Sequence, residues 1–140
     1  MKLAIGCDHA GVAAKKALLE SVLSGHEVLD VGTDSDRPVD YPDYARLVAA
    51  AVASGKVERG ILICGTGIGM AMAAGKVPGI RAATCCEPYS AELSRRHNDA
   101  NVLCMGARLI AVEMMKKVTE TWLASPFDGG RHAPRVEKIG

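Results

Sequence analysis

Short apolar segments alternate along the chain with longer segments whose apolar residues recur at helical spacing. The segment 60–64, GILIC, is apolar at almost every position, which is typical of a strand buried on both faces. Residues 11–24 instead place their larger apolar side chains at helical spacing, up to Gly25. The pattern predicts strands over 2–7, 27–31, 60–64, 80–85 and 102–106, and helices over 11–24, 44–54, 67–76, 88–97 and 109–124.

Strands that alternate with helices indicate a parallel sheet covered by helices on both faces. Five strands in 140 residues predict one α/β domain over 1–140, a three-layer α/β/α Rossmann-like sandwich. The turn-rich segment 33–43 is predicted to be a loop, and residues 125–140 a polar tail. In such folds ligands bind beyond the carboxyl ends of the strands, so the residues that follow each strand are the first site candidates.

Polar and glycine residues follow every predicted strand. They are Asp8 and His9 after the first strand, Asp40 and Tyr41 after the second, Cys64 to Gly69 after the third, Glu87 after the fourth, and Gly106 to Arg108 after the fifth. Asp8 and His9 suit a sugar hydroxyl or a phosphate. A helix cap and a satisfied histidine explain the same pair equally well.

The third strand runs into a glycine-rich turn, CGTGIGM, at residues 64–70. Glycines let backbone N–H groups converge on an anion, and a following helix adds its positive end. Met70 stands where the dinucleotide-binding pattern G-x-G-x-x-G has its third glycine, while Glu87 lies about where that pattern has a ribose-binding acid. A nucleotide site, another anion site and a simple chain turn all stay open at this point.

Cys64 stands directly before these glycines. A helix N-terminus stabilises a thiolate, and N–H groups beside it stabilise an oxyanion. A base next to an oxyanion hole suits the removal of a proton beside a carbonyl group. The alternative is an inert cysteine at the end of a buried strand, which is the commoner role of a lone cysteine.

Composition and charge argue against several classes of function. A net charge of +1, with no basic run longer than a pair, argues against binding to nucleic acid or to a membrane surface. No apolar run is long enough to span a bilayer. The five cysteines are odd in number and lie within apolar runs, which argues against disulfides and favours the cytoplasm. The four histidines are scattered and lack a ligand motif, so no metal site is expected.

Two further stretches carry candidate residues. HNDAN, 97–101, sets His97 and Asn98 just before the last strand, where a plain turn is the alternative. GGRHAPR, 129–135, places Arg131 and Arg135 four residues apart, and two guanidinium groups can clamp a phosphate. A solvated tail is the alternative there, and Pro134 argues against a regular helix.

Together these stretches resemble the ribose-5-phosphate isomerase B family, to which related allose- and galactose-phosphate isomerases belong. The motifs that carry the resemblance are GCDHAG, DYPDYA, GILICGTGIGMAMAAGKVPGIRAA, CEPYSAELSRRHNDAN, MGAR and GGRHAPRVEKI, in the family's order, from residue 2 to about 139. The resemblance implies a cofactor-free aldose–ketose isomerase with the strand order 2-1-3-5-4. Its expected substrate is ribose 5-phosphate, with a six-carbon sugar phosphate as the alternative. Two functions of different classes also stay open, namely a non-catalytic sugar-phosphate binding module and a nucleotide-binding domain.

The resemblance also implies roles for single residues. Cys64 is the expected base between C1 and C2, and Thr66 the expected proton relay. His97 is expected to open the sugar ring, with help from Asp8 and Asn98. The others are expected to hold the enediolate through the backbone (Gly65, Gly67, Ile68 and Gly69), to bind the phosphate (His9, Arg108, Arg131 and Arg135) or to line the pocket (Tyr41). One branch of the family uses a Glu after the glycine loop, where this chain has Met70.

The place of His97 in the chain predicts a shared site. Cys64 follows a strand, whereas His97 precedes one, so the two lie at opposite edges of the sheet. A strand of about five residues spans ~17 Å, which a histidine side chain does not bridge. We therefore expect a homodimer, or a tetramer built from it, in which His97 of one subunit completes the site around Cys64 of the other. The tail, 125–140, is expected to contribute to the phosphate site or to the dimer.

Overall fold

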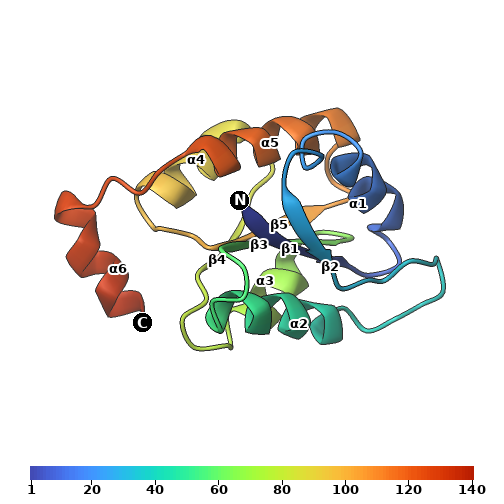
Figure 1. The fold of residues 1–140 in the computed structure, drawn as a ribbon, viewed down its shortest axis with the longest axis horizontal. Helices are drawn as coiled ribbons and strands as arrows, with labels where there is room; N and C mark the ends of the chain where they lie inside the picture. The colour runs from blue at the N-terminus through green and yellow to red at the C-terminus, as the bar shows by residue number, and fades with distance from the viewer.

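The computed structural model describes residues 1 to 140. Strands and helices alternate along the chain, as the hydrophobic pattern predicts (Figure 1). The elements are β1 (Lys2–Cys7), α1 (Val12–Leu19), β2 (Glu27–Asp30), α2 (Tyr41–Ala53), β3 (Arg59–Cys64), α3 (Ile68–Ala74), β4 (Ala82–Thr84), α4 (Pro88–Arg96), β5 (Val102–Gly106), α5 (Val112–Ala124), the 3-10 turn η1 (Gly130–His132) and α6 (Ala133–Ile139). None of these helices combines the length and the hydrophobicity that a bilayer crossing requires.

The five strands form one parallel sheet in the order β2-β1-β3-β5-β4. β3 pairs with β5 from Gly60 opposite Val102 to Cys64 opposite Gly106. The predicted parallel sheet and its predicted strand order are both confirmed. Because β1, β3 and β5 lie side by side, the loops that follow them meet at one edge of the sheet.

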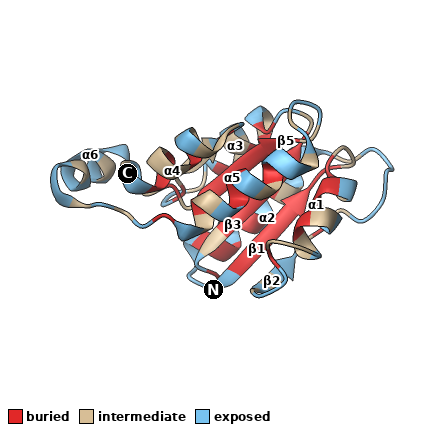
Figure 2. Cartoon of the chain, turned by 90° about the horizontal axis from the view of Figure 1, so that it is seen from above, coloured by how far each residue is buried: buried red, intermediate tan, exposed pale blue.

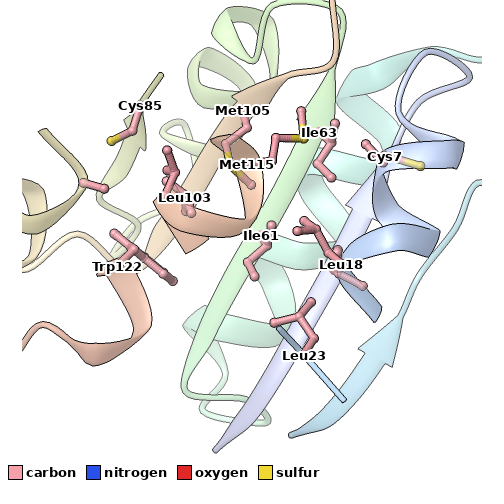
Figure 3. Close-up of a cluster of buried hydrophobic side chains, with 14 of the residues drawn as sticks. Cys7, Leu18, Leu23, Ile61, Ile63, Cys85, Leu103, Met105, Met115 and Trp122 are labelled. Carbon is pink, nitrogen blue, oxygen red and sulfur yellow. The ribbon is translucent and has the colours of Figure 1, made fainter. Parts of the chain in front are cut away.

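Helices cover both faces of the sheet, with α1, α4 and α5 on one face and α2 and α3 on the other (Figure 1). Side chains alternate along each strand, so a strand contributes to both layers. In β3, Ile61 and Ile63 belong to the cluster that contains Trp122 of α5 (Figure 3). Leu62 points the other way and joins the cluster that contains Val48 of α2. Strands buried on both faces explain the continuous apolar runs in the sequence.

The helices differ by one to five residues from their predicted limits, and α2 and α1 are two examples. α2 begins at Tyr41 rather than at 44, because Pro42 occupies its first turn, where the fixed φ of proline suits a helix. Tyr41 therefore stands on a helix and not in a loop. α1 ends at Leu19 instead of 24, and residues 20–25 form a turn.

The C-terminal arm, residues 125–140, corrects a prediction. The sequence predicts an irregular polar tail, but the arm contains η1 and α6. Pro134 does not prevent α6, because it lies in the first helical turn, where a missing N–H costs no hydrogen bond. No residue of η1 or α6 is buried, and Figure 2 shows this part of the arm projecting beyond the layered body.

Candidate active site

The carboxyl ends of β1, β3 and β5 join the segments that follow them. The N–H of Asp8 donates to the carbonyl of Ile63 (3.1 Å), and the N–H of Arg108 donates to the carbonyl of Gly65 (3.0 Å). The structure therefore gathers Asp8, the segment after Cys64 and Arg108 at one edge of the sheet. This is the edge where ligands bind in parallel α/β sheets.

The glycine loop, residues 65–69, is held by close packing. Gly67 has a φ of 79°, and a Cβ there would lie 2.9 Å from the carbonyl carbon of Met105. At Gly69 a Cβ would lie 2.5 Å from Cε1 of Tyr41, so the tyrosine ring packs directly against the loop. Both positions have room for glycine without a displacement of their neighbours, and for no larger residue.

The Cys64 side chain is almost fully enclosed beside this loop, with 5% of the residue exposed. Its Sγ accepts a hydrogen bond from the N–H of Gly67 at 3.1 Å. A backbone donor at the sulfur stabilises negative charge there. Three further N–H groups of the loop donate to no acceptor in the chain, namely those of Gly65, Thr66 and Gly69. These free N–H donors can stabilise an oxyanion that forms beside the enclosed thiol.

The other four cysteines have different surroundings. Burial raises the pKa of Cys7 to about 11, and burial also raises the pKa of Cys85 and of Cys104. The Cys7 thiol donates to a backbone carbonyl at 3.5 Å, whereas Cys64 accepts. Cys86 is exposed, and all five thiols are free. Cys64 is thus the thiol with a backbone N–H donor at its sulfur.

Asp8 and His9 shape the turn after β1. Asp8 is buried, and its Oδ1 accepts the N–H of Ala10 at 2.9 Å. Nδ1 of His9 accepts the N–H of Val39 at 3.2 Å. Because Nδ1 is the acceptor, the ring proton belongs on Nε2, which can donate to a ligand.

Lys15 is a residue of this region that the sequence reasoning missed. Its buried Nζ donates to Asp30 (2.8 Å), to Asp34 (3.0 Å) and to the carbonyl of Thr33 (2.7 Å). Burial lowers the pKa of Lys15, but the hydrogen bonds to Asp30 and Asp34 outweigh it and raise the pKa overall. These bonds hold the beginning of the loop 31–40, and Val39 of the same loop donates its N–H to His9. A lysine on the sheet-facing side of a helix is the signal that could have revealed it.

Thr66 and Arg108 present polar groups at the open side of the loop. Both residues are exposed, and Oγ1 of Thr66 accepts the N–H of Ile68 at 3.2 Å. The Arg108 side chain lies over Gly65, with Nη1 3.2 Å from the point where a Cβ would stand. Arg108 forms no salt bridge, so its guanidinium group can bind an anion.

His97 and Asn98 do not lie at this edge. They follow α4 directly and precede β5, which begins at Val102. Cys64 lies opposite Gly106, at the other end of β5. One chain therefore brings Cys64 close to Arg108 but leaves His97 at the opposite edge, which is the separation predicted from their order in the chain.

The C-terminal arm lies against His97. The imidazole rings of His97 and His132 stack with their centroids 4.2 Å apart and an interplanar angle of 11°. The pKa of His132 is lowered, first by desolvation and then by the nearby charges of His97, Arg131 and Arg135. Both arginines are exposed and form no salt bridge. His97, Asn98, Arg131 and Arg135 thus form a second group of candidate residues, which we call the arm group.

Two of the four histidines, although far apart in the sequence, lie together in the fold. His97, Asp128 and His132 bring their ligand atoms within 4.8 Å of one another. The arm returns to the end of α4 through contacts that the local sequence does not reveal. A spacing motif such as H-x-H could not have identified this cluster, because its members are more than thirty residues apart in two of the three pairings.

The HNDAN turn is built by specific ion pairs. Asp99 has a φ of 47°, a left-handed conformation that is uncommon outside glycine. Its carboxylate binds Arg95 at 2.9 Å and Arg81 at 3.2 Å. These contacts hold the turn that carries His97 and Asn98, so its backbone is more than a plain connection.

Sequence comparison agrees with this geometry. The family model for ribose/galactose isomerase matches residues 3–139. The chain belongs to the ribose/galactose isomerase family. Ribose-5-phosphate isomerase B of Escherichia coli K12 is 52% identical over 139 residues, which cover 99% of this chain and 93% of that protein.

Solved structures of the family match the whole fold. Ribose-5-phosphate isomerase B of Clostridium thermocellum superimposes with a TM-score of 0.98 at 50% identity, covering 100% of this chain and 95% of the other. The same enzyme of Mycoplasma genitalium, solved with bound ribulose 5-phosphate, has a TM-score of 0.93 at 40% identity and covers 99% of this chain and 93% of its own. The predicted family resemblance is confirmed.

Glu87, the residue that a nucleotide-binding site would use to bind a ribose, has a structural role here. Glu87 is the N-cap of α4, and its carboxylate accepts the N–H groups of Tyr89 (2.7 Å) and Ser90 (2.8 Å). Hydrogen bonds from Ser90, and then from Tyr89, lower the pKa of Glu87. The carboxylate therefore serves the helix and is not free to bind a ribose.

Proposed function

We propose that the chain interconverts ribose 5-phosphate and ribulose 5-phosphate through an enediolate, with Cys64 as the base and without a cofactor. Family membership and the relative solved with ribulose 5-phosphate support this substrate. The single observation that carries the chemistry is the hydrogen bond from the N–H of Gly67 to Sγ of Cys64, beside a loop with free N–H donors.

In the proton transfer, the Cys64 thiolate removes the proton on C2 of the open-chain aldose. The electron pair of that C–H bond forms the C1–C2 double bond, and the negative charge moves to O1. Backbone N–H groups of residues 65–69 stabilise this oxygen, and one such donor is worth ~3–4 kcal/mol. The thiol returns its proton to C1, while Thr66 passes the O2 proton to O1. The product is the ketose, with every proton accounted for.

The ring form of the sugar must open before this step. Opening removes the proton from the anomeric hydroxyl and adds a proton to the ring oxygen. We assign these transfers to His97, with Asp8 and Asn98 orienting the hydroxyl groups. His97 and Asn98 belong to the arm group, so they reach the sugar only if they come from a second subunit.

A homodimer with two shared sites follows from this separation. One subunit supplies Cys64, Asp8 and the glycine loop, and the other supplies the arm group. A tetramer would be two such dimers. The exposed arm fits this arrangement, because its residues find little to pack against in their own chain.

The phosphate binds to cationic and donor groups that have no other partner. Nε2 of His9 and the guanidinium groups of Arg108, Arg131 and Arg135 are the proposed ligands, and Tyr41 lines the pocket. The phosphate lies away from C1 and C2, so its binding energy can hold the reacting carbons against the base.

The proposed setting is the cytoplasm, with a sugar phosphate as the partner and no nucleic acid or membrane. Five free thiols are what a reducing compartment maintains. The near-neutral net charge of +1 offers no electrostatic attraction to nucleic acid or to anionic lipid.

A substrate panel tests the function. We expect ribose 5-phosphate to have the highest kcat/KM among phosphorylated pentoses and hexoses. A six-carbon substrate such as allose 6-phosphate or galactose 6-phosphate is the second candidate, because the family model spans ribose and galactose isomerases. Binding of ribose 5-phosphate without ketose formation would instead identify a binding module, and thermal stabilisation by NAD or AMP alone would identify a nucleotide domain.

A further inference from the structure

Three metal-ligating side chains meet where the C-terminal arm touches α4. His97 lies at the end of α4, Asp128 lies in the segment after α5, and His132 ends η1. One ligand atom of each residue lies within 4.8 Å of those of the other two, and the centroids of the two imidazole rings are stacked 4.2 Å apart. The three residues belong to one chain, so the cluster exists without a second subunit.

The carboxylate in this cluster is oriented by a neighbour. Nε of Arg96 donates to both oxygens of Asp128 at 3.1 and 3.2 Å, and the N–H of Asp128 donates to the carbonyl of Arg96 at 3.0 Å. A carboxylate has about four acceptor positions, so it can bind an ion while it keeps these bonds. Ligating carboxylates are commonly held by such outer hydrogen bonds.

The second histidine can adjust its position. Gly129 and Gly130 precede it with φ values of 65° and 53°, and a Cβ at either would meet nothing within 4 Å. Metal–nitrogen bonds of ~2.0–2.1 Å require ligand atoms about 3.3 Å apart in a tetrahedral site. Because the lone pairs lie in the planes of the two stacked rings, the His132 ring must also tilt out of the stack to face one ion with His97, and rotation at this glycine pair permits that movement.

We propose that His97, Asp128 and His132 bind a divalent transition-metal ion and that this ion reversibly inhibits the isomerase. Two imidazoles and one carboxylate suit Ni²⁺, Zn²⁺ or Cu²⁺, and do not suit Mg²⁺ or Ca²⁺, which prefer oxygen ligands. The inhibition, but not the binding, rests on the proposed function, because a metal-bound His97 can no longer transfer a proton. The charges of Arg131 and Arg135 weaken the binding without occupying a ligand atom.

Calorimetric titration of the tag-free protein with Ni²⁺ tests the site. Ni²⁺ is the probe because Zn²⁺ also binds thiols strongly. We expect one Ni²⁺ per chain in wild type, about tenfold weaker binding in Asp128→Asn and about 100-fold weaker binding in His132→Ala. Asp36→Asn, which removes an exposed carboxylate outside the cluster, is the matched control. Absent binding, or equal affinity in wild type and both cluster variants, would overturn the site and leave the isomerase proposal untouched.

The inhibition is measured separately. We expect Ni²⁺ to abolish ribose 5-phosphate isomerisation, EDTA to restore it, and Asp128→Asn to resist Ni²⁺ while keeping its basal rate. Ni²⁺ bound at this cluster without loss of activity would overturn the inhibition and would also contradict the role of His97.

Discussion

In the proposed site the glycine loop and the C-terminal arm carry groups for the same substrate, yet the two regions are built in opposite ways. The loop is packed against Met105 and Tyr41, and its neighbour Cys64 is 5% exposed. In the arm, no residue of η1 or α6 is buried, and Ile139 is 60% exposed. The loop is shaped by packing within its own chain, whereas the arm is held by a few polar and ring contacts such as Arg96 with Asp128 and His97 with His132.

This difference separates two tasks of the site. Proton transfer at carbon needs a base and donors placed within a few tenths of an ångström, which packed backbone provides. A phosphate carries its charge on several oxygens and tolerates flexible guanidinium groups. The contrast also fits the proposed homodimer, since a second subunit would cover the exposed side chains of the arm.

The largest expected effect is at the base. Cys64→Ala should lower kcat about a thousandfold while leaving the affinity for ribose 5-phosphate almost unchanged, because the thiol acts on carbon. Steady-state kinetics and calorimetry measure the two quantities. Cys86→Ala is the control, because that thiol is free but exposed and remote from the glycine loop in sequence. A Cys64→Ala variant that kept more than about a tenth of kcat would remove Cys64 from the role of base.

The next effect concerns the arm. Arg131→Ala or Arg135→Ala should raise KM about ten- to hundredfold and change kcat less, because each loses a charge-assisted contact to the phosphate. Initial-rate kinetics with ribose 5-phosphate give both constants. Arg46→Ala, an exposed arginine of α2, should leave both unchanged. An unchanged KM in both arm variants would show that the two arginines do not bind the phosphate and that the arm is a solvated tail.

The smallest effect tests the packing of the loop. Gly69→Ala should destabilise the fold by about 1 kcal/mol, because the new Cβ displaces the Tyr41 ring. In a Tyr41→Ala background the same change should cost almost nothing, and denaturant unfolding measures the difference. Gly25→Ala is the control, since its Cβ would meet nothing within 4 Å. Equal losses with and without Tyr41 would show that the ring does not hold the loop.

Much of the body of the protein could be predicted from the sequence. β5 has the limits predicted for it, 102–106, because a strand buried on both faces leaves an uninterrupted apolar run. The candidate residues at the sheet edge followed from the rule that parallel strands present their carboxyl ends together. The strand order came from the family resemblance and not from the pattern.

The arm and the supporting polar contacts could not be predicted in the same way. The stack of His97 on His132 and the pairing of Arg96 with Asp128 join segments more than thirty residues apart. No local spacing encodes such contacts. Lys15 was missed for a related reason, because its acidic partners, Asp30 at the end of β2 and Asp34 in the loop that follows, approach it only in the folded chain.

Complementation between two inactive variants tests the shared site most directly. Cys64→Ala and His97→Ala should each be almost inactive alone. When they are co-refolded in equal amounts, about half of the dimers should be mixed, and each mixed dimer should hold one intact site and one doubly altered site. With a shared site, about a quarter of wild-type activity should be recovered. No recovery, with mixed dimers demonstrated by native mass spectrometry, would contradict the sharing of the site between subunits.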